Sequence, residues 1–196
     1  MPRAFNEYEQ AHIRDRLRKA GRQLFASNGV AKASIDQLVA AAGIAKGSFY
    51  KFYDSKELLF MDLLEESQNR IRAPLLTSRA SSRKAFEQLL RKLFSEFCAD
   101  PLIMLMGREL EFHTVVRRLP PDYLHKHQQD DQSFLEALIS KWNKKRRLPA
   151  RDVMAARMTM LALLGVQREF VGERLLPYAL DAAVSSLADV LFETGG

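Results

Sequence analysis

The sequence predicts an all-α protein in two parts, an N-terminal three-helix domain with a helix-turn-helix over residues 8–56 and a C-terminal helical bundle over residues 57–196. Apolar residues recur at helical rather than alternating spacing along most of the chain. Gly and Pro fall mostly between these periodic segments. Helix-capping patterns, "SIDQ" at 34–37 and "DSKE" at 54–57, mark where two of the helices start.

The N-terminal domain is expected to contain three helices. The first ends near Gly29, because an Asn-Gly pair suits the left-handed backbone that closes a helix. The second starts at Ser34, whose hydroxyl caps it while Gln37 reaches back, and ends at Gly43. A short third helix covers residues 45–52. The apolar stripe of the first helix is Ile13, Leu17, Ala20 and Leu24.

The C-terminal bundle is expected to contain longer helices. The first of them is capped by Asp54 with Glu57 and ends near Arg72, ahead of Pro74. Proline at position 101 suits the first turn of another helix. The further expected helices cover residues 81–99, 101–119, 121–147, 150–171 and 178–192.

Composition limits the function classes. The one cysteine, Cys98, cannot form a disulfide within the chain, and its place on an apolar stripe favours an inert thiol. The first residues lack the apolar middle of a signal peptide. The longest apolar runs are broken by Arg108 and Arg157, short of the roughly 18 residues that a membrane span needs. We therefore expect a cytoplasmic protein without a membrane partner.

Positive charge is concentrated at the N-terminal end. Residues 1–56 hold ten Lys or Arg and five Asp or Glu, a net charge of +5 out of +6 for the whole chain. A basic end joined to a nearly neutral remainder indicates that this end meets a polyanion.

The third helix divides into an inner and an outer face. Phe49 and Tyr53 lie four residues apart and are expected to pack in the core. A recognition helix presents its N-terminal residues to base edges in the major groove, where Lys can donate to guanine and Ser can pair with several bases. Helix starts favour phosphate oxygens. The residues expected to contact DNA are Ser34, Lys46, Gly47, Ser48, Tyr50, Lys51 and Lys56.

Catalytic and metal chemistry find little support in the sequence. His125 and His127 lie two residues apart and diverge on a helix, unlike a zinc-binding pair four residues apart. No glycine-rich phosphate loop or serine-nucleophile elbow is present. We expect a non-enzymatic protein without a cofactor or a metal.

The segment "KASIDQLVAAAGIAKGSFYKFYDSKELLF", residues 32–60, resembles the DNA-binding domain of the tetracycline-repressor (TetR) family of bacterial regulators. The resemblance covers about residues 10–60. It implies a repressor-like, ligand-responsive homodimer that binds a pseudo-palindromic operator and is released by a small hydrophobic effector. The alternative is a DNA-binding regulator that senses no ligand and is controlled by a protein partner.

The resemblance also implies roles for the C-terminal part, where effector binding and dimerisation are expected. An apolar and aromatic cavity is expected over residues 80–170. Arg108, Glu109 and His113 interrupt an apolar helix there, and they either pair with one another or with groups of a neighbouring subunit, or one of them orients a polar ligand end. The expected lining is Phe94, Phe97, Met104, Leu105, Arg108, Phe112, Phe134, Met158 and Leu161.

The dimer interface is expected in the last two helices, where two apolar stripes would form a four-helix bundle with a second subunit. The alternative is that both stripes pack only within one subunit. The stripes consist of Val153, Met160 and Leu164 on one helix, and Leu180, Val184, Leu187 and Leu191 on the other.

Overall fold

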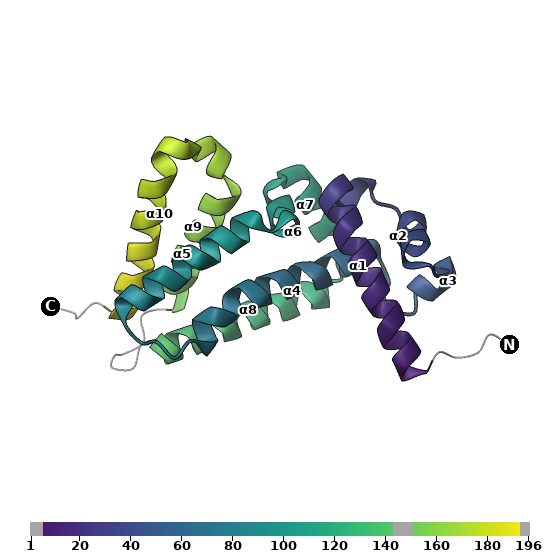
Figure 1. Ribbon diagram of the computed structural model, residues 1–196, viewed down its shortest axis with the longest axis horizontal. Coiled ribbons are helices and arrows are strands. Elements are labelled where there is room, and N and C mark those ends of the chain that lie inside the picture. The colour runs from purple at the N-terminus through teal and green to yellow at the C-terminus, as the bar shows by residue number, and fades with distance from the viewer. Residues whose placement is uncertain (1–5, 143–150, 193–196) are drawn as a thin grey trace. The chain divides into compact units, whose positions relative to one another are not determined.

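The computed structural model describes residues 6–142 and 151–192, without the side chains of residues 109–111, 151 and 152. Every regular element in these residues is helical (Figure 1), which confirms the predicted all-α fold class. The chain divides into two compact units, residues up to 67 with 101–119, and residues 68–100 with those from 120 onward. The predicted functional boundary between residues 56 and 57 stays a prediction.

The first unit is built around its N-terminal helix, α1 (Glu7–Lys32). The core forms where α1 meets the beginning of α4 (Lys56–Thr77), and there the rings of Phe25 and Phe60 lie edge to face with centroids 5.7 Å apart. The backbone of α1 leaves the helical conformation at Gly29, close to the predicted end. The buried stripe is Ile13, Leu17, Ala20 and Phe25, whereas Leu24 is half-buried.

Five shorter elements complete the first unit. Helices α2, α6 and α7 contact α1, and α3 contacts α2. The helix expected over 101–119 is interrupted at Arg108, whose φ of −84° and ψ of 80° are not helical. These elements are α2 (Ile35–Ala42), α3 (Lys46–Phe49), α6 (Pro101–Met104), the 3-10 helix η1 (Leu105–Gly107) and α7 (Glu109–Arg117).

The second unit contains the rest of α4 and four further helices. Its core includes an aromatic cluster in which the ring of Phe86 lies 4.9 Å from that of Trp142 and 5.8 Å from that of Phe192. The buried indole N–H of Trp142 donates to the carbonyl of Leu75 at 2.6 Å, which satisfies a polar group inside the core. The four helices are α5 (Arg83–Ala99), α8 (Pro121–Trp142), α9 (Arg151–Val166) and α10 (Arg168–Phe192).

Helix α9 approaches α5 closely at Gly165. A Cβ at this position would lie 3.1 Å from the Phe97 ring and 3.2 Å from Cys98 Sγ, tighter than ordinary packing allows. The thiol of Cys98 is half-buried, and burial raises its pKa. Both features fit a packed, unreactive position for this cysteine.

Two helices are longer than the sequence predicts. Helix α4 continues through Pro74 to Thr77, because Ile71 and Leu75 on either side of the proline are buried in the second unit. Tertiary packing therefore outweighs the hydrogen bond that proline removes. Helix α10 begins at Arg168 rather than near Tyr178 and turns at Gly172, where φ is +74°.

Helix α10 also corrects the expectation that no segment could span a membrane. By length and composition alone it is apolar enough to do so. The turn at Gly172 interrupts it, and Val184, Leu187 and Leu191 are buried against the rest of the second unit. A core helix of a globular bundle passes the same test, so the apolar character of α10 is weak support for a membrane role.

Candidate nucleic-acid interface

Local hydrogen bonds fix the start and the end of α2, the first helix of the helix-turn-helix. The Gln37 N–H donates to Ser34 Oγ at 3.2 Å, and the Ser34 N–H donates to Gln37 Oε1 at 2.9 Å, which confirms the predicted capping box. Gly43 ends the helix with φ +64° and ψ +42°, a left-handed conformation that a side chain disfavours. Ser34 Oγ accepts the bond from the Gln37 N–H through its oxygen, so the hydrogen of the Ser34 hydroxyl can still donate to a phosphate.

Helix α3 is very short and depends on Phe49 for its position. The Phe49 side chain is fully buried, as predicted, and its ring lies edge to face with Tyr50 at 5.4 Å. Lys46, Gly47 and Lys51 are exposed, Tyr50 is 49% exposed, and Ser48 is half-buried. A Cβ built on Gly47 would meet nothing within 4 Å, so this part of the helix is open to a partner.

Lys46 is paired with an acid from α2. Its Nζ lies 2.9 Å from Asp36 Oδ1 and 3.2 Å from Oδ2, although both side chains are largely exposed. The hydrogen bond and the charge of Asp36 raise the pKa of Lys46. Lys46 therefore stays positively charged, and its three N–H donors can serve Asp36 and a DNA base or phosphate at the same time.

Lys56 has a position different from the one expected of a phosphate contact. Its Nζ donates to the carbonyls of Val30 at 2.7 Å, Ala31 at 3.1 Å and Ala33 at 2.6 Å. An ammonium group has three N–H donors, so each can have a carbonyl acceptor here. These carbonyls lie at the end of α1 and just after it, where helix carbonyls lack partners within the helix. Lys56 thus clamps the junction between α1 and α2.

A part-buried network links the residues after α3 to α1 and α4. The hydroxyl of Tyr53 donates to Asp62 at 2.5 Å, and Arg18 of α1 forms an ion pair with the same carboxylate. Burial, together with the bond to Asp62, raises the pKa of Tyr53 to about 12. Burial opposes the charge on Arg18, but the Asp62 and Glu66 carboxylates outweigh this effect and raise its pKa. Arg18 is therefore held by two carboxylates of α4.

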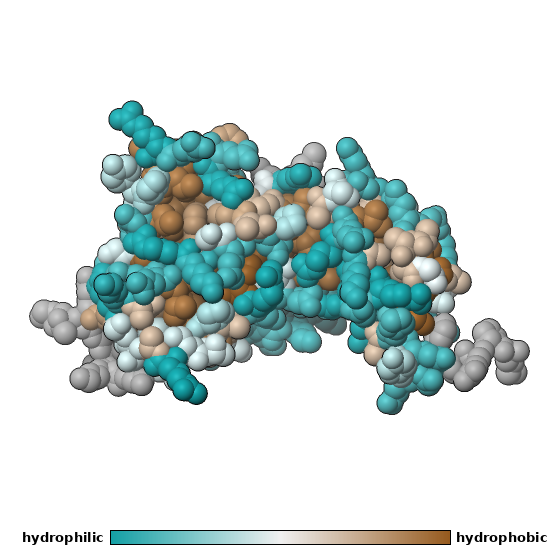
Figure 2. Space-filling model, in the orientation of Figure 1, coloured by the Kyte–Doolittle hydropathy of each residue, from teal (hydrophilic) through white to brown (hydrophobic). Residues whose placement is uncertain are grey.

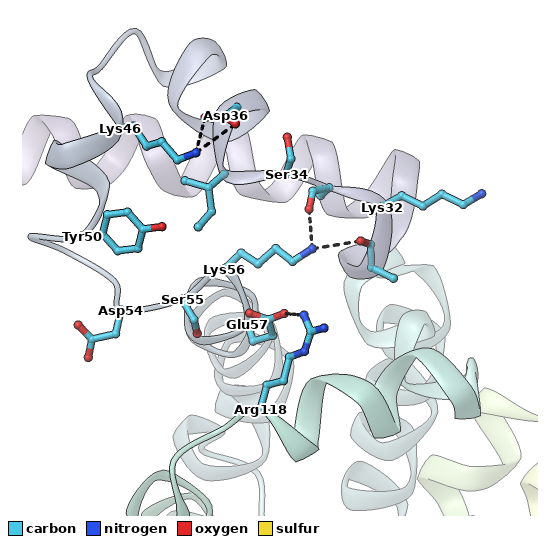
Figure 3. Close-up of a pocket in the computed structure, with 13 residues that line it drawn as sticks. Lys32, Ser34, Asp36, Lys46, Tyr50, Asp54, Ser55, Lys56, Glu57 and Arg118 are labelled. Atoms are coloured by element: carbon cyan, nitrogen blue, oxygen red, sulfur yellow. Dashed lines mark hydrogen bonds and ion pairs between the residues drawn. The ribbon is translucent and has the colours of Figure 1, made fainter.

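An open pocket of about 460 Å³ lies beside α2, α3 and the start of α4, and Ser34, Lys46 and Lys56 are among the residues that line it (Figure 3). The start of α4 differs from the prediction, because Ser55 Oγ rather than Asp54 accepts the bond from the Leu58 N–H. Glu57 is 6% exposed and accepts a bond from Arg118 at 2.8 Å. The pocket is lined by Ala31, Lys32, Ala33, Ser34, Ile35, Asp36, Lys46, Tyr50, Asp54, Ser55, Lys56, Glu57 and Arg118.

The sequence had indicated Ser34, Lys46, Tyr50 and Lys56 for this surface, and all four line the pocket. The sequence-based prediction of DNA contacts did not include Asp36, because an acidic side chain does not by itself indicate DNA binding. It had also missed Arg118, because nothing local connects it to Glu57, 61 residues earlier. In residues 6–142 and 151–192 no cluster of His, Cys, Asp or Glu could hold a metal ion.

The predicted effector residues fall into both compact units. Met104, Leu105, Arg108 and Phe112 belong to the first unit, and the other five belong to the second. Arg108 and His113 are exposed, and the Glu109 side chain lies outside the described residues, so the predicted pairing among the three has no test here. None of the nine lines the pocket beside α2 and α3.

The predicted dimer residues differ in exposure. Val184, Leu187 and Leu191 are at most 3% exposed within one subunit, so a partner could not contact them directly. This burial favours the intramolecular alternative for these three residues, and their place in a dimer interface stays a prediction. Val153 and Met160 are 40% and 65% exposed. Leu164 and Leu180 are half-buried.

Comparisons with known proteins agree with this geometry. Residues 17–63 match the family profile described as bacterial regulatory proteins, tetR family. The "Uncharacterized HTH-type transcriptional regulator YdgC" of Bacillus subtilis (strain 168) is 36% identical over 59 residues, which are 30% of this chain and 30% of YdgC. The chain thus matches less than a third of that relative's length.

Solved structures resemble the chain over almost its whole length. A TetR transcriptional regulator from Rhodococcus sp. RHA1 has a TM-score of 0.68 at 15% identity, with 95% of this chain and 100% of that chain covered. The regulator FadR from Bacillus subtilis, in complex with stearoyl-CoA, has a TM-score of 0.64 at 15% identity, with 91% and 99% covered. At these identities the similarity shows a common fold.

Proposed function

We propose that the chain, whose residues 17–63 match the tetR family profile, is a transcriptional regulator of this family that acts in the cytoplasm as a dimeric repressor at a pseudo-palindromic operator. The observation that carries the proposal is the open face shared by α2, α3 and the start of α4. Ser34, Lys46 and Tyr50 line this face together. A cluster of exposed donors on a basic three-helix unit is suited to a DNA backbone and its base edges.

Each side chain has a distinct task in this proposal. The hydroxyls of Ser34 and Tyr50 donate to phosphate oxygens and so fix the position of the domain on the duplex. Lys46 and Ser48 are near the start of α3 and read base edges in the major groove. Gly47 has no side chain, so the backbone of α3 can come close to the bases.

Selection of bound sequences from random DNA tests this function. The wild-type protein is expected to enrich an inverted repeat whose half-sites are one helical turn or more apart. Ser48→Ala is expected to change the preferred bases, whereas Lys32→Met, which removes an exposed charge from the pocket rim, should weaken all sequences alike. Enrichment of no inverted repeat would sink the proposal.

The proposed dimer uses the exposed faces of α9 and α10. On α9, Val153, Met160 and Leu163 are 40%, 65% and 55% exposed. On α10, Leu175 and Tyr178 are 59% and 75% exposed. Figure 2 shows brown, hydrophobic surface among the teal residues over α9 and α10. Adjacent helices with apolar outer faces can form a four-helix bundle with a second copy. The family resemblance supports dimerisation through these same helices.

Sedimentation of two variants tests the dimer. Met160→Glu introduces a charge on the exposed face and is expected to yield folded monomers. Leu187→Glu introduces a charge in the core, where the side chain is fully buried, and is expected to unfold the subunit. A Met160→Glu protein that still sediments as a stable dimer would exclude this face of α9 from the interface.

We also propose a small hydrophobic effector. FadR of Bacillus subtilis, with the same fold, was crystallised with stearoyl-CoA, which supports a ligand role for the fold. Thermal-shift screening of hydrophobic metabolites, followed by operator-release assays with each hit, tests the idea. Hits that stabilise the protein without changing its affinity for DNA would favour the alternative, in which a protein partner controls the regulator.

A further inference from the structure

Asp36 places a negative charge on the face proposed to meet DNA. It lies in the first turn of α2, and its side chain is 71% exposed. Both carboxylate oxygens are close to Lys46 Nζ, at 2.9 Å and 3.2 Å, as the dashed lines in Figure 3 show. The two side chains thus form one acidic and basic pair directly beside the start of α3.

Folding gives little reason for this pair. Water screens both charges at such exposure, so the ion pair contributes little to stability. DNA binding gives a reason against it, because an exposed carboxylate repels the phosphates of every DNA sequence. Asp36 therefore lowers affinity in general, unless one kind of base pair offers its oxygens a hydrogen-bond donor.

We propose that Asp36 and Lys46 together read one G·C pair in each operator half-site, an inference that rests on the proposed DNA-binding function. In the major groove a G·C pair presents guanine N7 and O6 as acceptors and cytosine N4 as a donor. Guanine O6 and cytosine N4 are hydrogen-bonded to each other within the base pair, so they lie roughly 3 Å apart. The 2.9 Å separation between Lys46 Nζ and Asp36 Oδ1 matches this spacing.

The match gives each group a complementary partner. Lys46 donates to guanine O6 and N7, while Asp36 accepts from the cytosine N4 amino group. The ion pair between Lys46 and Asp36 can stay intact in the complex, because the two side chains lie alongside the base edge with each donor facing an acceptor. Lys46 and Asp36 come from different helices, so their order along the groove is fixed and a C·G pair in the reverse orientation is not equivalent.

An A·T pair fits less well. Its one donor, adenine N6, lies between the acceptors adenine N7 and thymine O4. A carboxylate that reaches N6 therefore meets lone pairs on both sides, and Lys46 is left with O4 beside the thymine methyl group. The penalty that Asp36 imposes on all DNA is thus relieved best at G·C, which makes Asp36 a specificity-determining residue.

The test is a selection from random DNA with four proteins, followed by competition binding to the selected site and its point variants. Asp36→Asn is expected to lose the preference for G·C at one position of each half-site by roughly tenfold or more, and Lys46→Met should lose it at the same position. Affinity of Asp36→Asn for unrelated DNA should rise. Asp54→Asn is the matched control, because Asp54 is also exposed on the pocket rim. It should raise affinity for unrelated DNA and keep the preference.

Two other outcomes are informative and distinct. If Asp36→Asn and Asp54→Asn raise affinity for all sequences alike and retain the same base preferences, Asp36 acts only as a charge and the proposed reader is wrong. If the wild-type protein enriches no inverted repeat, the proposed operator binding itself fails and the reader fails with it. Thermal unfolding of each variant checks that the exposed substitutions leave the fold intact.

Discussion

Substitution of Lys56 separates two tasks that one lysine could have at this interface. In Lys56→Met the aliphatic stem is kept and the ammonium group is lost. The carbonyls of Val30, Ala31 and Ala33 then lose the donor they share in the structure. If the clamp at the α1–α2 junction is the main task, stability must fall. If phosphate contact is the main task, DNA affinity and its salt dependence must fall instead.

The size of the stability change follows from these bonds. A hydrogen bond to a charged group contributes about 1.5–3 kcal/mol, and the carbonyls of Val30 and Ala33 accept in partly buried positions. Water can replace the donor at the exposed bond to Ala31. The three bonds come from one ammonium group that lines an open pocket, so water can also reach the two part-buried carbonyls once the group is gone. We therefore expect the free energy of unfolding to fall by about 2 kcal/mol in total, within the range of a single hydrogen bond to a charged group. For a chain of this length, this corresponds to a Tm lower by roughly 4–8 °C.

Two measurements distinguish the tasks. Differential scanning calorimetry gives the change in Tm, and DNA titrations over a range of salt give the slope of log K against log salt. The clamp predicts an unchanged slope, whereas loss of one phosphate contact reduces it by about 0.9. Lys32→Met removes the same charge from the same pocket and should leave Tm unchanged. An unaltered Tm in Lys56→Met, together with a slope smaller by about one, would refute the clamp.

Three further predictions concern other parts of the molecule. The raised pKa of Tyr53, about 12 against an ordinary value of 10.0, means that folding favours its protonated form, so its stabilising effect is present below about pH 10 and is lost as the pH rises through 12. Spectrophotometric titration should show one late-ionising tyrosine that Tyr53→Phe removes, and a wild-type protein without it would contradict the prediction. Gly165→Ala should lower stability by about 1–3 kcal/mol in urea unfolding, because the new Cβ meets Phe97; Gly47→Ala, with open space around its Cβ, is the control, and equal stability of the two would count against close packing of α9. Arg118→Ala should cost about 1–2 kcal/mol in the same assay, because it leaves the carboxylate of Glu57 buried without this partner; an equal loss in an Ala variant of the exposed neighbour at 117 would exclude the ion pair as the cause.

Much of the helix-turn-helix could be predicted because its signals are local. The capping box of Ser34 and Gln37 and the end of the helix at Gly43 each involve residues close in the chain, and the structure contains both as predicted. The burial of Phe49 followed from its position on a helix whose other face is polar. The helix boundaries were less certain, because Pro74 ends a helix by local rules and yet lies within α4.

The sequence alone determined the all-α fold class and the place of the helix-turn-helix, since helical periodicity and caps depend on neighbours a few residues apart. Only the tertiary structure decided that Asp36 meets Lys46 and that Lys56 turns toward the carbonyls at the end of α1. Both depend on the angles between helices, which no local pattern encodes. The same holds for α10, which has apolar residues on more than one face. Periodicity could not tell that Leu187 faces the core while Tyr178 faces outward, because that choice is made by packing against α5 and α9.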